Sequence, residues 1–334
     1  MRIGLSYDLK EAVLLGEASP EDALEEYDSA ETVEFIAAAL EAKGHSVVML
    51  GGGREFLNNI LREKVDIVFN IAEGRGSYRS RESQVPSVLE MLGIPYSGSD
   101  PQCLAICLDK PLTKKLVAAK GVWTPEWQLI TDEEEFGHIP WSQFAFPAII
   151  KPAYEGSSKG IRLTSVVDSA EHLTEEVNRL FKCYQQPVMV EKFVTGDEVT
   201  VGIIGNSPPK VIGMMRILPK RRENHFVYSL EVKRDYQNLV NYECPAQLTS
   251  EVLERITSSS LKVFRILGCR DFARLDFRVS ATGIPYFIEI NPLPGLGSYS
   301  DLVIMAIKLG WTHRELIGAV LDAALKRYPQ CVPA

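Results

Sequence analysis

The sequence predicts an α/β unit with a parallel sheet, followed by α+β units with antiparallel pairing. The chain has 334 residues, which is too long for one core of ordinary size, so two or three packed units are expected. Over the first hundred residues, short apolar runs alternate with helical patterns, which is typical of a parallel sheet with helices on both faces. Further along, apolar runs follow one another with few helices between them, which favours antiparallel strands.

The elements of the first unit can be placed in order. Strands are expected at RIGLSY, HSVVMLG, VDIVFNI and IPYSGS. A long helix is expected over SPEDALEEYDSAETVEFIAAALEAKG, with Ser19 as N-cap, Pro20 in the first turn and Gly44 as the stop signal. Two shorter helices should follow the second and third strands. Ligands in such folds bind at the carboxyl ends of the strands, near Tyr7, Gly51 and NIAEGRGSYRSRES.

A helix over about residues 102–120 leads into a different pattern. Strands are expected at EWQLI, FPAIIKP, GIRLTSV, PVMVEKFV, EVTVGIIGN and KVIGMMRI, with one clear helix around 168–181. A polar, basic segment, 218–243, precedes a helix at 248–267, two strands and two C-terminal helices. We therefore predict three domains, over residues 1–102, 103–187 and 188–334.

Composition limits the class of partner. The net charge of -8 argues against general nucleic-acid binding, which needs a basic surface. The basic run KRRENH in 218–243 leaves nucleic acid as an alternative, which the acidic balance of the whole chain disfavours. The first residues do not form a signal peptide, and no apolar stretch approaches membrane-spanning length. We expect a cytoplasmic protein with small-molecule partners and no membrane contact.

The cysteine pattern gives no sign of a metal site. Six cysteines occur without a CxxC pair or zinc-finger spacing, at positions 103, 107, 183, 244, 269 and 331. Cys103 and Cys107 could face each other on a helix, but free cysteine is commonly a core residue. We therefore predict buried thiols, a reducing compartment and no structural metal.

The segment ARLDFRVSATGIPYFIEIN predicts a hairpin with carboxylates on one face. Two apolar runs flank the turn SATG, whose glycine suits a turn conformation. If the pairing is symmetric about the last peptide bond of SATG, Asp276 lies opposite Glu289. Arg274 then lies opposite Asn291, because these two residues are also equally far from that bond. Because side chains alternate faces along a strand, all four project from the same side.

Three interpretations of this hairpin are open. Directly paired carboxylates, with Cβ atoms roughly 5 Å apart, repel each other unless a positive group lies between them. An oxygen-only set of Asp, Glu and Asn is typical of magnesium or manganese sites. The pair could also be an exposed ladder neutralised by Arg274, or the acid and nucleophile of a glycosidase. Phosphate ligands elsewhere in the chain would favour the metal.

Two further segments could contact a nucleotide. In FPAIIKPAYEGSSKGI, a strand ends in Lys151, and the loop 156–158 can turn N–H groups and hydroxyls toward phosphate oxygens. The loop matches neither the Walker A motif nor GxGxxG, and an ordinary hairpin turn explains it equally well. In VMVEKFVTGDEVTVG, Glu191 and Glu198 flank a turn, and an acid after such a turn can accept hydrogen bonds from ribose hydroxyls.

In this order, these segments resemble the ATP-grasp superfamily and, within it, the D-alanine–D-alanine ligase family. The resemblance covers most of residues 60–310, in PYSGSDPQCLAICLDKPLTKKLVAAKGVWTPEW, IIKPAYEGSSKGI, VMVEKFVTGDEVTVGIIGN, GCRDFARLDFRV and YFIEINPLPGLGSYSDL. It implies an ATP-grasp fold, in which an N-terminal parallel α/β domain precedes two α+β subdomains that grip ATP. It also implies a homodimer.

The resemblance implies roles position by position. ATP ligands would be Lys110, Lys151, Glu191, Lys192 and Val194 through their backbone, and Glu198. Ligands of two Mg²⁺ or Mn²⁺ ions would be Asp276, Glu289 and Asn291. Catalytic residues would be Arg274, Ser157 and the mobile-loop lysine Lys233, and Ser300 would bind the second substrate's carboxylate.

The implied reaction transfers the γ-phosphoryl group of ATP to a carboxylate, and an amine then displaces phosphate from the acyl phosphate. Metal ions, lysines and Arg274 would stabilise the negative charge that develops in both steps. The acyl phosphate must be protected from water, and the segment 218–243 is a candidate lid.

The sequence departs from the family pattern at the amino-acid sites. The Gly-Gly-x-Ser-x-Glu signature is missing, and Glu73 stands where a histidine is usual, with Arg79 and Arg81 nearby. Arg234 replaces the tyrosine after the lid lysine, and Asp301 replaces an apolar residue.

These departures lead to the hypothesis of a ligase that joins something other than two D-alanines, with an extra carboxylate bound by Arg79 or Arg81. Ordinary solvation of a surface loop is the alternative for both arginines. A ligase for other amino acids or a specialised metabolite, and a non-catalytic nucleotide-binding protein of the same fold, stay open.

Overall fold

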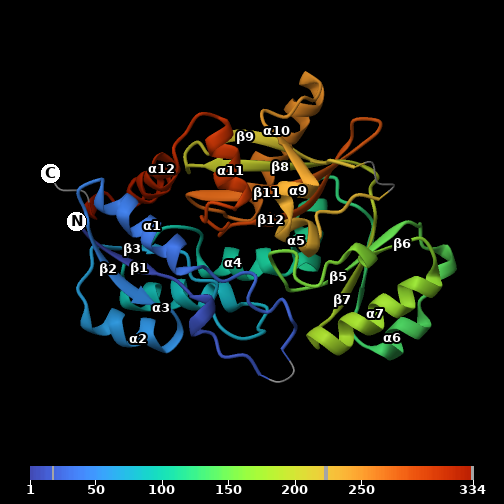
Figure 1. Ribbon diagram of the computed structural model, residues 1–334, viewed down its shortest axis with the longest axis horizontal. Helices are drawn as coiled ribbons and strands as arrows, with labels where there is room; N and C mark the ends of the chain where they lie inside the picture. The colour runs from blue at the N-terminus through green and yellow to red at the C-terminus, as the bar shows by residue number, and fades with distance from the viewer. Residues whose placement is uncertain (17–18, 222–224, 332–334) are drawn as a thin grey trace.

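The computed structural model describes residues 1–16, 19–221 and 225–331, which contain three sheets surrounded by helices (Figure 1). The first sheet is parallel, as predicted, in the order β2-β1-β3. Its strands are β1 (Arg2–Ser6), β2 (Ser46–Gly51) and β3 (Ile67–Asn70). Its helices are α1 (Ala30–Glu41), α2 (Gly53–Arg62) and α3 (Gln84–Leu92). Ile3 and Leu5 pack on α1, whereas Leu50 and Val68 pack against α2 and α3, so both faces are covered.

The first helix is shorter than predicted. It is capped by Ser29 rather than by Ser19, and residues 21–26 form turns. Tertiary contacts explain the difference, because the Asp22 side chain is fully buried. It accepts hydrogen bonds from the Gly160 amide, at 2.9 Å, and the Tyr184 hydroxyl, at 2.7 Å. A local helical tendency is too weak to compete with such contacts.

The predicted helix at 102–120 is two helices, α4 (Pro101–Leu108) and α5 (Lys110–Ala118). Proline at position 111 lacks an N–H group and cannot continue a helix that began upstream. Asp109 caps the second helix by accepting a hydrogen bond from the Leu112 amide at 3.0 Å. The break places Lys110 at the start of α5, where its amine donates to the Glu155 carbonyl.

The second sheet is antiparallel, in the order β4-β7-β5-β6. Its strands are β4 (Trp127–Ile130), β5 (Ala148–Pro152), β6 (Val166–Val167) and β7 (Val188–Lys192). Helices α6 (Glu133–His138) and α7 (Ala170–Tyr184) accompany it. The expected strand GIRLTSV is mostly absent, because Ser165 accepts a hydrogen bond from the Arg162 amide and a 3-10 turn, 163–165, forms. The proposed domain boundaries stay a prediction. Strand β7, which those boundaries assign to the third domain, pairs with β4 and β5 of this sheet.

The third sheet is antiparallel, in the order β10-β9-β8-β11-β12. Its strands are β8 (Gly196–Ile204), β9 (Lys210–Pro219), β10 (Val240–Glu243), β11 (Phe272–Ser280) and β12 (Pro285–Asn291). Helix α10 (Ser250–Ile266) matches its prediction. The segment 218–243 forms α8 (Leu230–Arg234), α9 (Tyr236–Leu239) and strand β10, while residues 222–224 of KRRENH lie outside the described residues.

The carboxylate hairpin has the predicted pairing at its functional end. Asp276 lies opposite Glu289, and Arg274 opposite Asn291. The assumed symmetry is wrong nearer the turn, because a bulge follows Asp276 and Phe277 pairs with residue 287. The extra residue of the bulge lies between the carboxylates and the turn. The pairing nearer the turn therefore changes by one residue, while Asp276 stays opposite Glu289.

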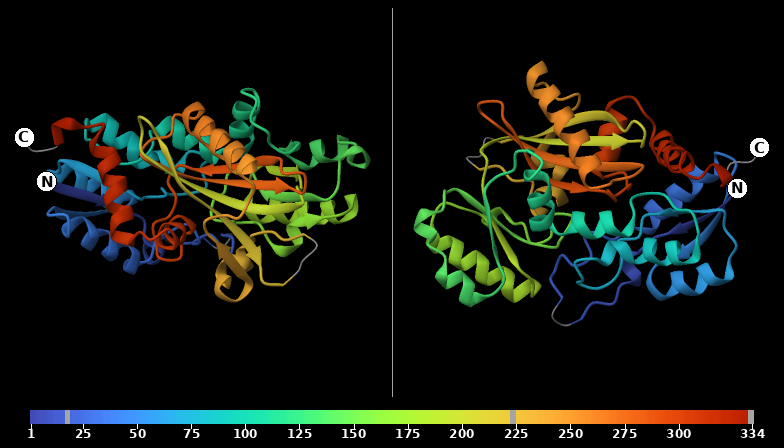
Figure 2. Two further views of the ribbon diagram at one scale, coloured as in Figure 1. Left: turned by 90° about the horizontal axis from the view of Figure 1, so that it is seen from above. Right: turned by 180° about the vertical axis from the view of Figure 1, so that it is seen from behind.

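The last two helices, α11 (Asp301–Lys308) and α12 (His313–Leu325), return to the first sheet (Figure 2). Helix α12 packs against α1, and one apolar cluster joins Leu302 and Leu316 to Ile3 and Phe69. The N-terminus and the last described residues lie at the same side of the molecule. Among the described residues, no helix is long and apolar enough to cross a membrane.

Candidate active site

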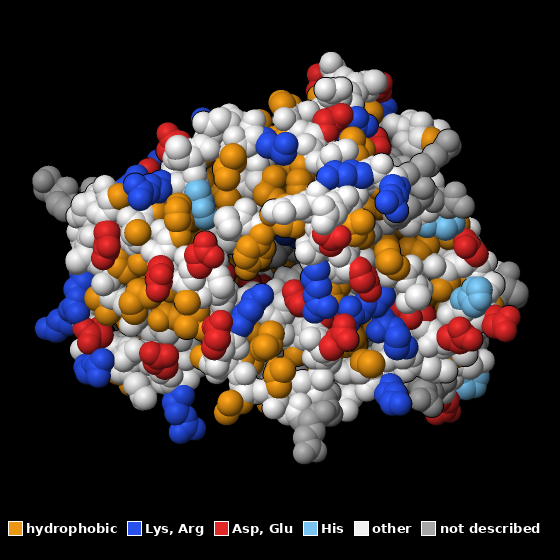
Figure 3. All heavy atoms as spheres, in the orientation of Figure 1, with side chains coloured by type: hydrophobic (Ala, Val, Ile, Leu, Met, Phe, Trp, Pro, Cys, Tyr) orange, Lys and Arg blue, Asp and Glu red, His pale blue; other side chains and the backbone are white. Residues whose placement is uncertain are grey.

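Two adjoining cavities lie where the three sheets meet. The sheet cavity, about 70 Å³, is bounded by the second and third sheets; the N-terminal cavity, about 350 Å³, extends from it to the first unit. Both are lined by Tyr228, Lys233, Arg274 and Asp301. Charged side chains surround a hollow at the centre of the face in Figure 3. The larger volume suits a small-molecule site.

The paired carboxylates of β11 and β12 line the sheet cavity. Asp276 accepts hydrogen bonds from the Thr200 hydroxyl at 2.8 Å and from Arg274 at 3.0 Å. The amine of Lys110 lies 3.8 Å from Glu289. Burial alone would raise the pKa of Glu289, but Lys110 and other cations outweigh it and lower the pKa to about 2. Glu289 is therefore ionised at neutral pH, whereas burial raises the pKa of Asp276.

Two buried lysines share one carboxylate beside this pair. The amine of Lys151 lies 3.2 Å from Glu191, and that of Lys114 lies 2.6 Å from the other oxygen. Burial lowers the pKa of Lys114 to about 8, and the attraction of Glu191 opposes this. The sequence analysis missed Lys114, although its spacing of four from Lys110 places both on one helix face.

Arg278 organises the predicted adenine and ribose end of the sheet cavity. Its guanidinium donates to the carbonyl of Val194 at 2.9 Å and to Glu198 at 3.1 Å. It also lies over the Phe193 ring, 4.5 Å from the centroid. Lys192 lines the same cavity. The sequence analysis missed Arg278, which strand alternation places on the same face as Arg274 and Asp276.

The serine loop lies beside the lid. Ser157 and Ser158 both have positive φ, 51° and 59°, a conformation that costs about 1–3 kcal/mol for residues other than glycine. The hydroxyl of Ser158 donates to the Tyr228 carbonyl at 3.0 Å. Ser157 lines the N-terminal cavity with Asn291.

Helix α8 of the candidate lid lies over both cavities. Lys233 lines them, with its amine 5.2 Å from the centroid of the Tyr228 ring. Arg234 forms an ion pair with Glu25 at 2.5 Å. The residue that departs from the family pattern thus joins the lid to the N-terminal segment.

The structure shows where Arg79 and Arg81 lie, and their predicted role in binding a substrate carboxylate stays a prediction. Neither lines the N-terminal cavity. Arg81 is 1% exposed and donates to Glu26 at 2.6 Å and to Glu155 at 3.2 Å, so its guanidinium is occupied within the protein. Arg79 is an exposed side chain, 3.3 Å from Asp109. Arg81 therefore joins the N-terminal segment to the loop before Ser157.

Two further acids belong to the lining of the N-terminal cavity. Asp28 is 8% exposed, and Glu73 is half-buried; both line the N-terminal cavity. Neither carboxylate makes a hydrogen bond or ion pair within the part of the chain that the structure describes. Burial, followed by repulsion from Asp8, raises the pKa of Asp28 to about 7. Burial and repulsion from Glu82 also raise the pKa of Glu73 well above its ordinary value.

Ser300 and Asp301 begin helix α11 at the junction of the cavities. Ser300 lines the N-terminal cavity, and its side chain makes no capping hydrogen bond. Asp301 is buried, accepts a hydrogen bond from the Tyr228 hydroxyl at 3.2 Å, and lies 3.6 Å from Arg274. Asp301 therefore positions the Tyr228 hydroxyl and the Arg274 guanidinium in the site.

This arrangement matches a known structure. The chain superposes on the crystal structure of D-alanine–D-alanine ligase from Bacillus anthracis complexed with ATP, with a TM-score of 0.76, 25% identity and 99% coverage of each chain. Two antiparallel sheets around a cleft of lysines and carboxylates define an ATP-grasp enzyme, a ligase that uses ATP to form C–N bonds.

Sequence comparisons then give the family. The model of the D-ala D-ala ligase C-terminus matches residues 116–322. D-alanine–D-alanine ligase from Aquifex aeolicus is 34% identical, over 94% of this chain and all of the relative. An uncharacterised Sinorhizobium fredii protein, y4sG, is 31% identical, over 88% of each chain. The chain belongs to the D-alanine–D-alanine ligase family, as its resemblance indicated.

Proposed function

We propose that this ATP-dependent ligase activates the carboxylate of one amino-acid-like substrate at the junction of its two cavities and joins it to the amine of a second. The observation that carries the proposal is the position of Arg274, which lines both cavities, near Glu289, which lines the sheet cavity 3.8 Å from the amine of Lys110. Phosphate groups, a metal and a reacting carboxylate all require such charged groups at one place.

Asp276, Glu289 and Asn291 suit two Mg²⁺ or Mn²⁺ ions. Their side chains offer oxygen donors, and Glu289 is ionised at neutral pH. Bound ions would supply positive charge to the phosphate oxygens of ATP.

The chain's own residues supply the rest of the proposed chemistry. Lys110 and Lys151 bind phosphates as point charges, since both are buried beside acids and Lys151 lines the sheet cavity. Arg274 stabilises the negative charge on the substrate's carboxyl group while its oxygen attacks the γ-phosphorus and ADP leaves. It then stabilises the oxyanion that forms when the amine adds to the carbonyl carbon of the acyl phosphate, before phosphate leaves. Lys233 on the lid approaches the γ-phosphate, and the lid excludes water from the acyl phosphate.

The charge of the N-terminal cavity points to a cationic substrate. Arg274 and Lys233 line this cavity, and so do the unpaired Asp28 and Glu73. A substrate carboxylate would face the cations, and positive groups would face the acids. Two carboxylates exceed what one α-ammonium requires, so we propose an amino acid with a second cationic group, such as a diamino acid, as one substrate.

An ADP-release screen over pairs of D- and L-amino acids tests this substrate, with products identified by mass. We expect diamino acids to give a higher kcat/KM than alanine. If D-alanine alone supported about one turnover per second or more, the altered-substrate proposal would be abandoned. The protein would then do what the Aquifex aeolicus relative is named for.

We further propose a cytoplasmic homodimer, the state that the family resemblance implies. Sedimentation at several protein concentrations tests the dimer.

A further inference from the structure

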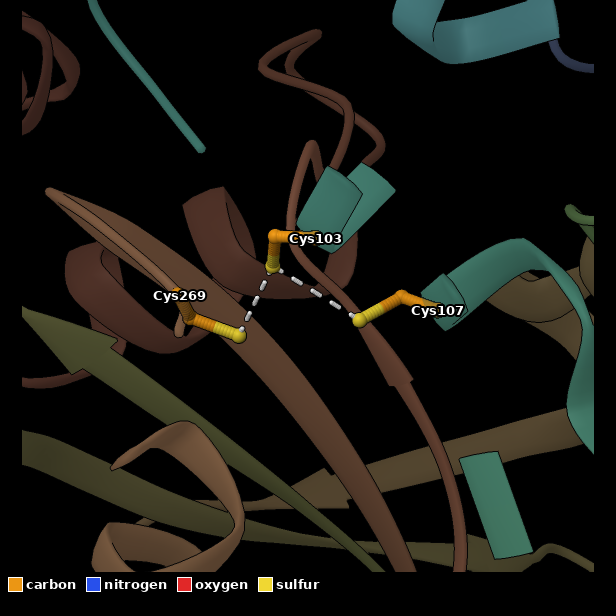
Figure 4. A group of neighbouring side chains, drawn as sticks. All are labelled: Cys103, Cys107 and Cys269. Atoms are coloured by element: carbon orange, nitrogen blue, oxygen red, sulfur yellow. Dashed lines mark hydrogen bonds between the residues drawn. The ribbon is translucent and has the colours of Figure 1, made fainter. Parts of the chain in front are cut away.

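Three cysteines lie together away from the ATP site (Figure 4). Cys103 and Cys107 lie one turn apart on α4, and Cys269 follows α10. The Sγ atom of Cys103 is 3.8 Å from that of Cys107 and 3.5 Å from that of Cys269. All three side chains are buried, and none forms a disulfide. Neither the proposed reaction nor the substrate cavities use them.

The spacing of the three sulfurs suits one metal ion. All three Sγ atoms lie within 4.8 Å of one another. A Zn–S bond is about 2.3 Å, so the sulfurs of a tetrahedral site lie about 3.8 Å apart. The two observed distances, 3.8 and 3.5 Å, are close to this value.

We propose that Cys103, Cys107 and Cys269 bind one thiophilic d¹⁰ cation, such as Zn²⁺ or Cu⁺. Thiolates select such soft ions over Mg²⁺, so this site would not compete for the metal of the ATP site. On binding, three S–H bonds break, three metal–sulfur bonds form, and three protons leave to solvent.

The position of the cluster gives the ion a structural effect. Cys107 lies three residues before Lys110, and Cys269 lies five residues before Arg274. An ion held by α4 and by the segment before β11 would tie together the two elements that bring these cations to the cleft. The sequence analysis predicted no structural metal, because it could not place Cys269 beside α4.

Cadmium titration of chelator-treated protein tests the site. We expect one equivalent of Cd²⁺ to produce a saturable ultraviolet sulfur-to-cadmium charge-transfer band. Cys269→Ser should lose the band or weaken binding at least tenfold, whereas the control Cys331→Ser should bind as the wild type does. A wild-type protein without the band, or a band equal in Cys269→Ser, would overturn the proposal.

A second measurement keeps the test valid if Cys269→Ser fails to fold. Wild-type protein is alkylated with and without Zn²⁺, and the modified cysteines are identified by mass spectrometry. We expect Zn²⁺ to slow modification of the three clustered cysteines at least tenfold and to leave Cys183 and Cys331 unchanged. Equal modification rates with and without Zn²⁺ would show that the cluster is only packed thiols.

Discussion

Charged side chains inside apolar strands are explained by their partners. Glu289 lies in a strand in which Phe287 and Ile290 are buried. The cations that act on its carboxylate are Lys110, Lys151 and Arg274. An isolated carboxylate there would be protonated, whereas these cations keep it ionised. The ionised Glu289 side chain therefore destabilises the folded protein little as long as these cations remain.

Replacing Glu289 by Gln should abolish most ligase activity. We expect ADP release to fall at least about a hundredfold, since a charge that acts on the phosphates is removed. The exposed control Glu254→Gln should keep full activity. ADP release that survives Glu289→Gln unchanged would contradict the catalytic assignment and favour a non-catalytic nucleotide-binding protein.

Asp28 should make stability fall as pH rises. Its folded-state pKa of about 7 exceeds the value of 3.8 for an exposed carboxyl, so between these values the folded state binds more protons than the unfolded state. Three pKa units correspond to roughly 4 kcal/mol as an upper limit. Asp28→Asn, which resembles the protonated form, should be more stable than the wild type at pH 8 and nearly equal at pH 3.5, by urea unfolding. No difference at pH 8 would contradict this account.

At the scale of elements, the lid is fastened by a contact between distant segments. Arg234 on α8 pairs with Glu25, and Ser158 bonds to the Tyr228 carbonyl. An exposed ion pair of this kind contributes about 0–1 kcal/mol. The ion pair itself therefore adds little to the stability of the lid, which also buries the apolar side chains of Leu230 and Val232.

Arg234→Ala should therefore affect the coupling of ATP cleavage to amide formation more than it affects the stability of the protein. We expect the free energy of unfolding to change by less than about 1 kcal/mol. The ratio of ADP released to amide formed should rise above one, because water reaches the acyl phosphate. Arg221→Ala, an exposed lid arginine with no ion pair among the described residues, is the control and should keep the ratio at one.

At the scale of the molecule, a buried ion pair joins the C-terminus to both other parts. Arg327 follows α12 and lies 2.6 Å from Asp271, which is fully buried before β11. It also donates to the carbonyls of Tyr96 and Gly98 in the N-terminal unit. Three segments far apart in sequence therefore depend on one guanidinium.

Arg327→Ala should destabilise the whole protein. Removing the cation leaves Asp271 buried without its ionic partner, which costs about 3–5 kcal/mol. The control Lys326→Ala, at an exposed neighbour, should change the free energy of unfolding by less than about 0.5 kcal/mol. Urea unfolding measures both; equal stabilities would show that Asp271 is satisfied by the Gly98 amide and Asn206 alone.

The sequence by itself determined most of the strands, the α/β and α+β classes, the family, and the pairing of Asp276 with Glu289, although IPYSGS forms only an isolated bridge and GIRLTSV is mostly not a strand. These features depend on local periodicity and on motifs within one hairpin, and both kinds of signal lie within short stretches of the sequence. The tertiary structure alone decided the start of α1, the occupation of Arg81, the unpaired state of Asp28 and the approach of Cys269 to α4. Each of these features depends on which segments about fifty or more residues apart the fold brings together. No local sequence pattern specifies those contacts.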